Sequence, residues 1–265
     1  MERWEAVSNH FLEFQFDKED SIWIMVHSGS RNIGKRLCDF FNEIAEKHGK
    51  RWYSKSTIPF LPVDCSDGKE YLTWLEFTSR FAFLNRKIML NDVIANLSHY
   101  FPNMKITTGE LFSELKDGLI NIHHNYAALE HHMGSNWYVH RKGATLARKG
   151  TVGLIPGSME TKSFVVVGIG ETISLNSCSH GSGRACGRKE FNTKNKDNVQ
   201  TIRDRLVSKG IVFTEFSKAT RGKDEGMFDV SETGDAYKDV VSVINDEADL
   251  VQAVVELTPI ISLKG

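Results

Sequence analysis

The chain has 265 residues, of which 40% are hydrophobic and 25% are charged, and its formal net charge is −1. This is the composition of an ordinary soluble globular protein, long enough for one large domain or two small ones. A net charge this close to zero does not indicate a polyanionic partner, although basic residues gather in residues 141–149 and 184–196.

Cysteine spacing and hydropathy further limit the kind of protein and the cellular compartment to which the chain could belong. The four cysteines have no paired spacing, which argues against a disulfide framework and favours a reducing compartment. No apolar run reaches membrane-spanning length, and the first residues, MERWEAVSNH, contain no apolar signal core. We therefore expect a cytoplasmic protein without a membrane partner. Zinc is disfavoured at Cys178, His180 and Cys186 because a CxxC pair is absent.

Hydrophobic periodicity predicts helices and strands that alternate along the chain. In the first half we expect strands at 9–15 and 21–27, a helix at 34–48, a loop at 54–69, a long helix at 71–100, a short polar helix at 108–117 and a strand at 120–122. In the second half we expect a helical segment at 127–132, strands at 137–140 and 163–167, a basic helix at 198–209, a strand at 211–216, a loop at 217–236, an amphipathic helix at 239–256 and a strand at 259–263.

Repeats, low-complexity tracts and a clear linker are all absent from the sequence. We therefore predict one α/β (mixed α+β) domain over residues 1–265, with mixed sheets flanked by helices.

Two small-residue turns dominate residues 153–188. The first, Pro156-Gly157-Ser158, is expected to leave the following amides free to face a ligand. The second presents His180 between serine and glycine, with Arg184 four residues on. A lightly shielded imidazole beside an arginine suits nucleophilic attack on phosphorus. The alternative is a Gly/Ser loop that carries a surface histidine.

Histidines also stand at the ends of strand-like segments, at His10, His27 and the pair His123-His124. Neutral imidazole is a good ligand for manganese or zinc, and the neighbouring Asn125 could bind a phosphate or orient a ligand. The alternative for each is a packed or capping histidine. A basic turn at residues 141–145 could hold a further phosphate.

Several short motifs occur together in a fixed order: NHFLE, HSGSR, HHNYA, HRKGAT, GLIPGSM, SCSHGSGR, AYKDV and a terminal LKG. Each is modest alone, but the ordered set is specific and covers essentially the whole chain. In this respect the sequence resembles the RtcB-type RNA ligases.

The resemblance implies an enzyme that uses GTP and manganese to join RNA 3′-phosphate or 2′,3′-cyclic phosphate ends to 5′-hydroxyl ends, in tRNA splicing or RNA repair. It implies that His180 is the nucleophile that becomes guanylylated, and that His10, His27 and His124 bind metal. The residues that match the family's nucleotide contacts are Asn9, Glu13, Asn125, Pro156, Gly157, Ser158, Met159, Ser163, Gly181, Ser182, Gly183 and Lys264. The implied partners are GTP and RNA, either tRNA halves or broken RNA.

The sequence departs from the family pattern in two places. The family binds two manganese ions partly through an aspartate and a bridging cysteine in a DxxC-like motif, and no such motif precedes NHFLE here. Glu160 also stands where the family usually has glycine. We therefore expect the C-terminal two-thirds of a ligase with a doubtful second metal site. This chain would be completed by an activating or complementing protein, or else be an inactive fragment that binds nucleotide or RNA. An unrelated three-histidine metal hydrolase is disfavoured by the ordered motifs.

Overall fold

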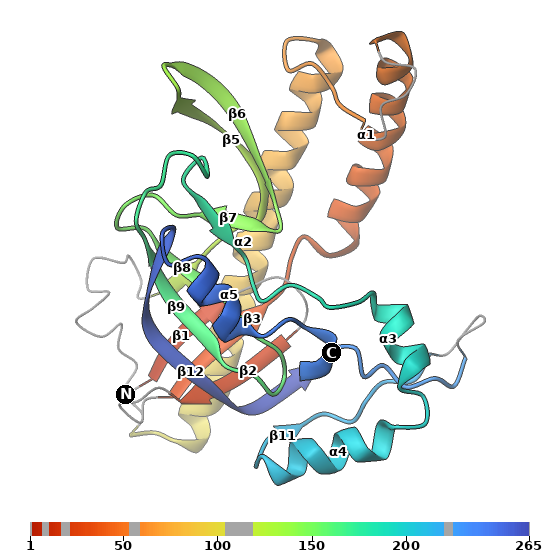
Figure 1. Cartoon of the computed structure of the whole chain (residues 1–265), viewed down its shortest axis with the longest axis vertical. Helices are drawn as coiled ribbons and strands as arrows, with labels where there is room; N and C mark the ends of the chain where they lie inside the picture. The colour runs from red at the N-terminus through yellow and green to blue at the C-terminus, as the bar shows by residue number, and fades with distance from the viewer. Residues whose placement is uncertain are drawn as a thin grey trace.

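The fold was analysed in a computed structural model that describes residues 2–6, 11–16, 22–52, 59–103, 119–219 and 225–264. Figure 1 shows a mixed sheet with helices packed around it and two long helices that extend well beyond it. The predicted α/β class with mixed sheets is therefore confirmed. The predicted short helix at 108–117 lies outside the described residues.

The largest sheet contains both parallel and antiparallel pairs. Its strand order is β4-β1-β3-β2-β12-β9-β8, and β11 pairs with β12 off this path. β1 is parallel to β3 and to β4, whereas β2, β12, β9 and β8 continue the sheet by antiparallel pairing. The strands are β1 (Glu2–Ala6), β2 (Phe11–Phe16), β3 (Ile22–His27), β4 (Leu119–Asn121), β8 (Val152–Ile155), β9 (Ser163–Gly168), β11 (Val212–Phe213) and β12 (Val251–Lys264).

The strand β3 is apolar on both faces because both faces are covered. Trp23 and Met25 join a core cluster with Leu257 of β12, whereas Ile24 and Val26 pack against Leu90 of the long helix. A strand buried on both sides reads as a continuous apolar run, which is what the sequence IWIMV shows. The strands predicted at 21–27 and 163–167 are confirmed.

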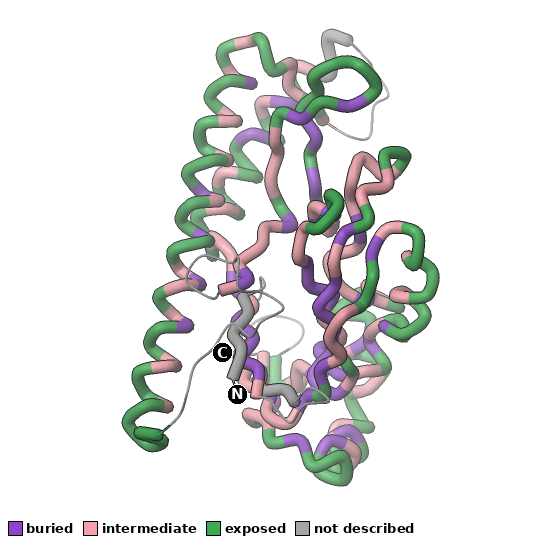
Figure 2. Tube along the Cα trace, turned by 90° about the vertical axis from the view of Figure 1, so that its left-hand side faces the viewer, coloured by how far each residue is buried: buried purple, intermediate pink, exposed green. Residues whose placement is uncertain are grey.

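Two long helices, α1 (Arg31–Trp52) and α2 (Ser66–Tyr100), confirm the predicted helices at 34–48 and 71–100 and extend them. Cys65 caps α2, since its Sγ accepts a hydrogen bond from the Gly68 amide at 3.3 Å. Buried α2 residues recur every four positions at Thr78, Ala82, Arg86 and Leu90. This spacing places the buried residues on one face of α2. Figure 2 shows short buried stretches recurring along a long helix that is otherwise mostly exposed.

The segment predicted to be helical at 127–132 is instead a strand, and this prediction was wrong. β5 (Asn125–His132) pairs antiparallel with β6 (Ser135–Lys142) through a two-residue turn. Met133 and Gly134 in that turn have φ values of 51° and 77°. Two positive φ values fit the right-handed twist of a tight hairpin. The hairpin signal is the Met-Gly pair, which outweighs the short helix-like pattern before it.

The helix predicted at 239–256 is correct only in its first part. α5 (Val240–Asp246) is capped by Asp239, whose carboxylate accepts from the Val241 and Ser242 amides. β12 then begins at Val251 and contains the strand predicted at 259–263. The first half of β12, residues 251–257, pairs with β9, and the second half, residues 258–264, pairs with β2. Tertiary pairing with β9 therefore overrides the local amphipathic pattern of residues 251–256.

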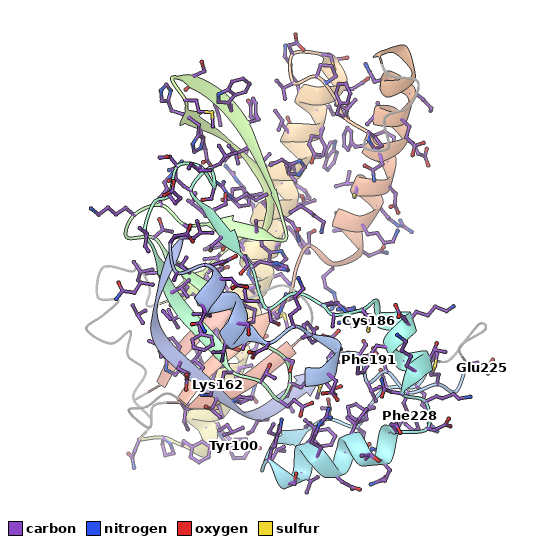
Figure 3. The ribbon with its side chains drawn as sticks, viewed as in Figure 1. Tyr100, Lys162, Cys186, Phe191, Glu225 and Phe228 are labelled. Carbon is purple, nitrogen blue, oxygen red and sulfur yellow. The ribbon has the colours of Figure 1, made fainter. Side chains whose placement is uncertain are left out.

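A second core cluster surrounds α3 (Arg188–Lys194) and α4 (Val199–Ser208), near Phe191 and Phe228 in Figure 3. This confirms the basic helix expected at 198–209, whereas the strand expected at 211–216 is only the two-residue β11. The remaining elements are β7 (Ala144–Leu146), which pairs with β10 (Ser177–Ser179), and a 3₁₀ turn at Gly234–Ala236 within the predicted loop.

A buried ion-pair network joins the hairpin to the loop before β10. Arg141 Nη1 donates to Glu130 Oε1 at 2.5 Å and Nη2 donates to Glu130 Oε2 at 3.1 Å, and both side chains are 2% exposed. His132 Nε2 lies 3.0 Å from the same carboxylate. Arg141 also donates to Ser177 Oγ and to the Leu175 carbonyl. The network therefore holds the base of β10 against β6.

We predict that Glu130→Gln lowers the free energy of unfolding by about 3–5 kcal/mol at neutral pH, because it leaves the buried Arg141 without its counter-charge. Burial raises the pKa of Glu130, but hydrogen bonds from Arg141 and His132 lower it overall to about 2, from an ordinary value of 4.5. A depressed folded pKa means that the carboxylate stabilises the fold above pH 4.5 and loses this effect as pH falls towards 2.

Urea unfolding at several pH values measures this difference. The matched control is Glu190→Gln, which breaks a solvent-exposed pair with Lys194 and should leave stability nearly unchanged. Equal losses in the two variants would contradict the assignment of a buried, structural ion pair.

Candidate functional site

The candidate site lies at the carboxyl ends of the parallel strands. Ala6 of β1 is in register with Val26 of β3 and with Asn121 of β4, so β3 and β4 end at the same edge of the sheet. His27 is the last residue of β3, and His124 follows β4 three residues after its end. The two rings meet edge-on with centroids 5.9 Å apart.

His180 joins this pair from a separate segment. It directly follows β10, and its ring centroid lies 4.6 Å from that of His124. The residue before it, Ser179, is anchored by Glu247, whose carboxylate accepts from the Ser179 amide and hydroxyl at 3.0–3.1 Å. The fold thus brings three of the predicted site histidines together from three distant parts of the chain.

The electrostatic surroundings keep these imidazoles neutral. Burial lowers the pKa of His180 below its ordinary value, a backbone hydrogen bond at Gly143 acts in the opposite direction, and the charge of Lys142 lowers it further. Burial, His180 and Lys142 together lower the pKa of His124 to about 3. Burial and the neighbouring histidines hold the pKa of His27 well below its usual range. Neutral imidazole is the form that acts as nucleophile or metal ligand.

Gly143 lies directly against the His180 ring. Its φ is +70°, its amide donates to the His124 carbonyl at 3.0 Å, and a Cβ atom here would lie 3.4 Å from Cε1 and 3.5 Å from Nδ1 of His180. The turn at residues 141–145, expected as a phosphate loop, is therefore in direct contact with both His124 and His180.

The amides of the Pro156 turn are not free, contrary to the expectation from sequence. The Gly157 amide donates to Ser163 Oγ at 3.1 Å, and the Ser158 amide donates to Thr161 Oγ1 at 2.7 Å. The Met159 amide donates to the Glu232 carbonyl at 3.2 Å. The hydroxyls of Thr161 and Ser163, a few residues after the turn, and the Glu232 carbonyl accept from these amides, which a proline-glycine pair in the sequence does not reveal.

The two small-residue turns pack against each other and enclose a cavity of about 230 Å³. The Ser182 amide donates to the Pro156 carbonyl at 3.1 Å, whereas the Ser182 side chain is buried and its Oγ has no hydrogen-bond partner in the structure. The described residues that line the cavity are Met25, His27, Pro156, Gly157, Ser158, Met159, His180, Gly181, Ser182, Gly183, Arg184, Arg188, Glu232 and Tyr237.

The far wall of this cavity carries two arginines and one carboxylate. Arg184 Nη1 donates to the Tyr237 hydroxyl at 3.1 Å, and its guanidinium stacks 4.8 Å from the centre of the Tyr237 ring. Arg188 Nη2 lies 2.8 Å from Glu232 Oε1, and Tyr237 donates to the same carboxylate. The wall is therefore positively charged overall and held in a fixed arrangement.

Glu160 does not add an unbalanced charge to the site. Its carboxylate accepts from Arg205 at 2.7 and 3.0 Å, from Lys209 at 2.8 Å and from the Gly234 amide at 2.7 Å. Burial raises its pKa, but hydrogen bonds from Lys209 and Arg205 lower it overall. The charge of Glu160 is thus balanced by Arg205 of α4 and by Lys209, which directly follows α4. Met159, the neighbour of Glu160, belongs to the core cluster around α3 and α4.

The C-terminal strand brings Lys264 near the same edge of the sheet. Lys264 is in register with Phe11, which is in register with His27, so the three lie side by side across β12, β2 and β3. The Lys264 ammonium donates to Asp229 Oδ2 at 2.6 Å. Glu13 of β2 is in register with Met25 and Ser262. Asn9 and His10 lie outside the described residues.

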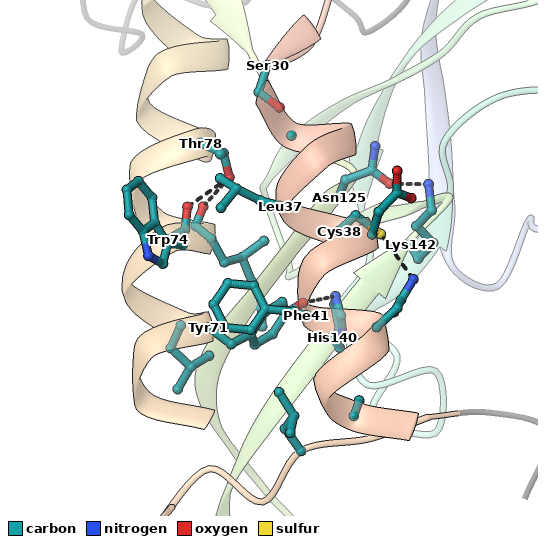
Figure 4. A pocket seen from close by; sticks show the side chains of 18 of the residues that line it. Ser30, Leu37, Cys38, Phe41, Tyr71, Trp74, Thr78, Asn125, His140 and Lys142 are labelled. Atoms are coloured by element: carbon teal, nitrogen blue, oxygen red, sulfur yellow. Dashed lines mark hydrogen bonds between the residues drawn. The ribbon is translucent and has the colours of Figure 1, made fainter. Parts of the chain in front are cut away.

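A wide groove of about 860 Å³ opens beside the site, between α1, α2 and the β5–β6 hairpin. Figure 4 shows Asn125 and Lys142 at one side of it, where Lys142 donates to Asn125 Oδ1 at 3.0 Å. Aromatic side chains including Phe41, Tyr71 and Trp74 line the rest. The sequence patterns did not indicate this groove. Trp74 is 40% exposed. Tertiary packing decides this exposure, and a local sequence pattern does not show it.

Two features of the described part of the chain concern metal-binding groups and membrane-spanning helices. There, no group of three or more His, Cys, Asp or Glu side chains is arranged to hold a metal ion. His27 and His124 form a pair, and the third expected donor, His10, lies beyond the described ranges. Within those ranges no helix has the length and apolar character needed to cross a bilayer.

We predict that Gly143→Ala places a methyl group in van der Waals contact with the His180 ring, because the added carbon would lie 3.4 Å from Cε1 of that ring. The matched control is Gly134→Ala, which has a similar φ of +77° but no atom within 4 Å of the added carbon. Both variants should lose about 1–2 kcal/mol of unfolding free energy from the left-handed backbone. NMR resonances of the His180 ring should shift only in Gly143→Ala, and equal shifts in both variants would refute the contact.

Comparison with known proteins identifies relatives over nearly the whole chain. A family model described as "tRNA-splicing ligase RtcB" matches residues 7–265. RNA-splicing ligase RtcB of Escherichia coli K12 is 36% identical over 98% of this chain and 60% of its own length. The tRNA-splicing ligase RtcB of Archaeoglobus fulgidus is 29% identical over 97% of this chain and 58% of its own length. The chain thus spans about 60% of the length of these relatives.

Proposed function

The chain belongs to the tRNA-splicing ligase RtcB family, and on that premise we propose that it carries the nucleotidyl-transfer centre of a GTP-dependent RNA ligase. The ligase joins RNA 3′-phosphate or 2′,3′-cyclic phosphate ends to 5′-hydroxyl ends. The observation that carries the proposal is a neutral His180, which lies beside two further histidines and on the wall of a cavity with two arginines.

In the proposed first step, a ring nitrogen of His180 attacks the α-phosphorus of GTP. A nitrogen–phosphorus bond forms, the bond to the β-phosphate oxygen breaks, and pyrophosphate leaves. The guanylate is then passed to the RNA 3′-phosphate, which restores the free histidine, and the 5′-hydroxyl of the second RNA end displaces GMP. A 2′,3′-cyclic end is first hydrolysed to the 3′-phosphate.

The surroundings of His180 support this chemistry. Arg184 and Arg188 provide fixed positive charge on the cavity wall, where charge develops on the transferred phosphate. Ser182 offers a buried hydroxyl without a partner, which suits a phosphate or ribose oxygen. Gly181 leaves room beside Pro156, since a Cβ there would lie 3.2 Å from the Pro156 carbonyl oxygen. These contacts favour nucleotide binding between the two turns.

His27 and His124, with His10 as a third donor, would hold manganese. The two described rings suit such an ion, because both are neutral and lie 5.9 Å apart between centroids. When bound, manganese supplies positive charge that stabilises the transferring phosphate. Within this chain, Lys142 adds a further charge beside the same histidines.

We propose that the RNA substrate binds in the groove beside Asn125 and Lys142. The aromatic lining of this groove suits unstacked bases. We also propose the cytoplasm as its compartment.

The second candidate is a chain that binds nucleotide or RNA and needs further protein for ligation. The observation that favours it is the histidine pair, which within the described residues has no third metal donor. The two candidates differ in one outcome. A binding module retains GTP without covalent label, whereas a ligase centre becomes labelled.

We predict that incubation with manganese and GTP radiolabelled at the α-phosphate labels the protein covalently, and that His180→Ala abolishes the label. A phosphoramidate is labile to acid and stable to alkali, so both treatments should be applied to the gel-purified protein. The matched control is His131→Ala on the hairpin, which removes a histidine that hydrogen-bonds Asn136. Label that persists in His180→Ala would sink the assignment of the nucleophile.

We further propose that Lys264 recognises the guanine base, since an ammonium can donate to O6 or N7. Lys264→Met should then reduce the preference for GTP over ATP by roughly tenfold or more, within the discrimination of about 1–3 kcal/mol expected for such contacts. Competition binding with the two nucleotides measures this ratio. Lys194→Met, which removes an exposed ion pair with Glu190, is the control. An unchanged ratio in Lys264→Met would mean that its pairing with Asp229 is purely structural.

A further inference from the structure

A buried arginine on α2 lies outside the machinery described above. The side chain of Arg86 is enclosed, with the residue 2% exposed. Its Nε donates to Asn121 Oδ1 at 2.8 Å and its Nη1 donates to the Ser28 carbonyl at 3.1 Å. Both acceptors are neutral. The full positive charge of this guanidinium therefore has no opposing charge among the groups that it contacts.

The remaining donor group of Arg86 is unused. Nη2 is buried and has no hydrogen-bond partner in the structure. Burial alone lowers the pKa of Arg86 to about 10, and no acidic residue of the described chain acts against this effect. Burying a charged group without a counter-charge costs several kcal/mol. A side chain kept in this state is suited to receive an anion.

The unused donor belongs to a small polar pocket. The pocket has a volume of about 60 Å³, and Arg86 shares its lining with Ser30, Ser79, His123 and Asn125. None of the described residues that line it is acidic. The volume admits one small tetrahedral group and excludes a nucleoside. Guanidinium forks match the oxygens of phosphate well.

The position of the pocket connects it to the site. Arg86 ties Ser28, directly after His27, to Asn121, the last residue of β4. The neighbouring Asn85 strengthens this connection, since it donates to Ser28 Oγ at 2.9 Å and to the Gly29 carbonyl at 3.3 Å. His124 also lines the pocket. An anion held there would lie next to the histidine cluster, on the α2 side of it.

We propose that this pocket binds a single phosphate group through Nη2 of Arg86, as an anion subsite distinct from the cavity beside His180. The site itself follows from the geometry, whereas the source of the phosphate rests on the proposed function. Two sources share this chemistry: the 3′-terminal phosphate of an RNA strand and a phosphate of the nucleotide.

The first experiment titrates the full chain with inorganic phosphate and follows binding by calorimetry. Arg86→Met should weaken phosphate binding at least about tenfold, the loss expected when a hydrogen bond to a charged group is removed. Ser79→Leu should have the same effect, because it fills the pocket without touching the two contacts that Arg86 makes within the protein. The matched control is Arg80→Met, which removes an exposed arginine paired with Glu76 on the same helix and should leave binding unchanged.

Ser79→Leu keeps the test decisive if Arg86→Met fails to fold, since it retains the contacts to Asn121 and Ser28. Unchanged phosphate affinity in folded Ser79→Leu would overturn the proposal, as would the absence of phosphate binding by the unaltered chain. In those cases water fills the pocket and Arg86 serves only to join the strand ends.

A second experiment distinguishes the sources. If RNA supplies the phosphate, the unaltered chain should prefer a 3′-phosphorylated oligoribonucleotide to its 3′-hydroxyl twin, and Ser79→Leu should lose that preference. If the nucleotide supplies it, Ser79→Leu should instead lose affinity for GTP relative to guanosine. A variant that loses neither discrimination would overturn the subsite. Covalent labelling of His180 is measured separately, so failure of the subsite and failure of the proposed ligase remain distinguishable.

Discussion

The candidate site depends above all on the pairing of β1 with two parallel neighbours. Because β3 and β4 run in the same direction on either side of β1, their carboxyl ends meet at one edge of the sheet. His27 and His124 are far apart in sequence and become neighbours through this pairing alone. Arg86 reinforces the arrangement from α2, since it hydrogen-bonds the chain at both strand ends. Any change that shifted β4 against β1 would separate the histidines.

The third histidine is positioned by a different set of contacts. His180 follows a short strand, β10, which pairs only with β7 over three residues. So short a ladder fixes a turn poorly without support. The support comes from charged side chains on both sides: the buried pair of Arg141 and Glu130 holds the start of β10, and the partly buried Glu247 binds Ser179 at its end. The packing of Gly143 against the ring then sets its distance from His124. Hydrogen bonds, rather than pairing in the main sheet, therefore fix the position of His180.

Much of this organisation could be predicted from sequence, for physical reasons that also explain the failures. The run IWIMVH predicts a buried strand with a histidine at its end, and the hydrophobic periodicity of residues 71–100 predicts α2. The errors lie where tertiary pairing decides. β5 depends on a two-residue turn with positive φ, and the start of β12, residues 251–257, depends on pairing with β9. Local patterns also could not show that the hydroxyls of Ser163 and Thr161 would occupy the amides of the Pro156 turn.

Nearby positive charges explain why the site histidines stay in the neutral form that can act as a nucleophile or a metal ligand. Lys142 and Arg86 act on His124, and Arg86 and Arg188 act on His27, so protonation of either ring would add positive charge to an already positive region. Burial works in the same direction. The same positive surroundings that keep the rings neutral also favour anions, because the described residues that line the cavity include two arginines, Arg184 and Arg188, and one carboxylate, Glu232. An anionic substrate would bind in this field while the imidazoles stay in the form that donates an electron pair. Affinity for phosphate and nucleophilicity of the ring therefore arise from one electrostatic arrangement.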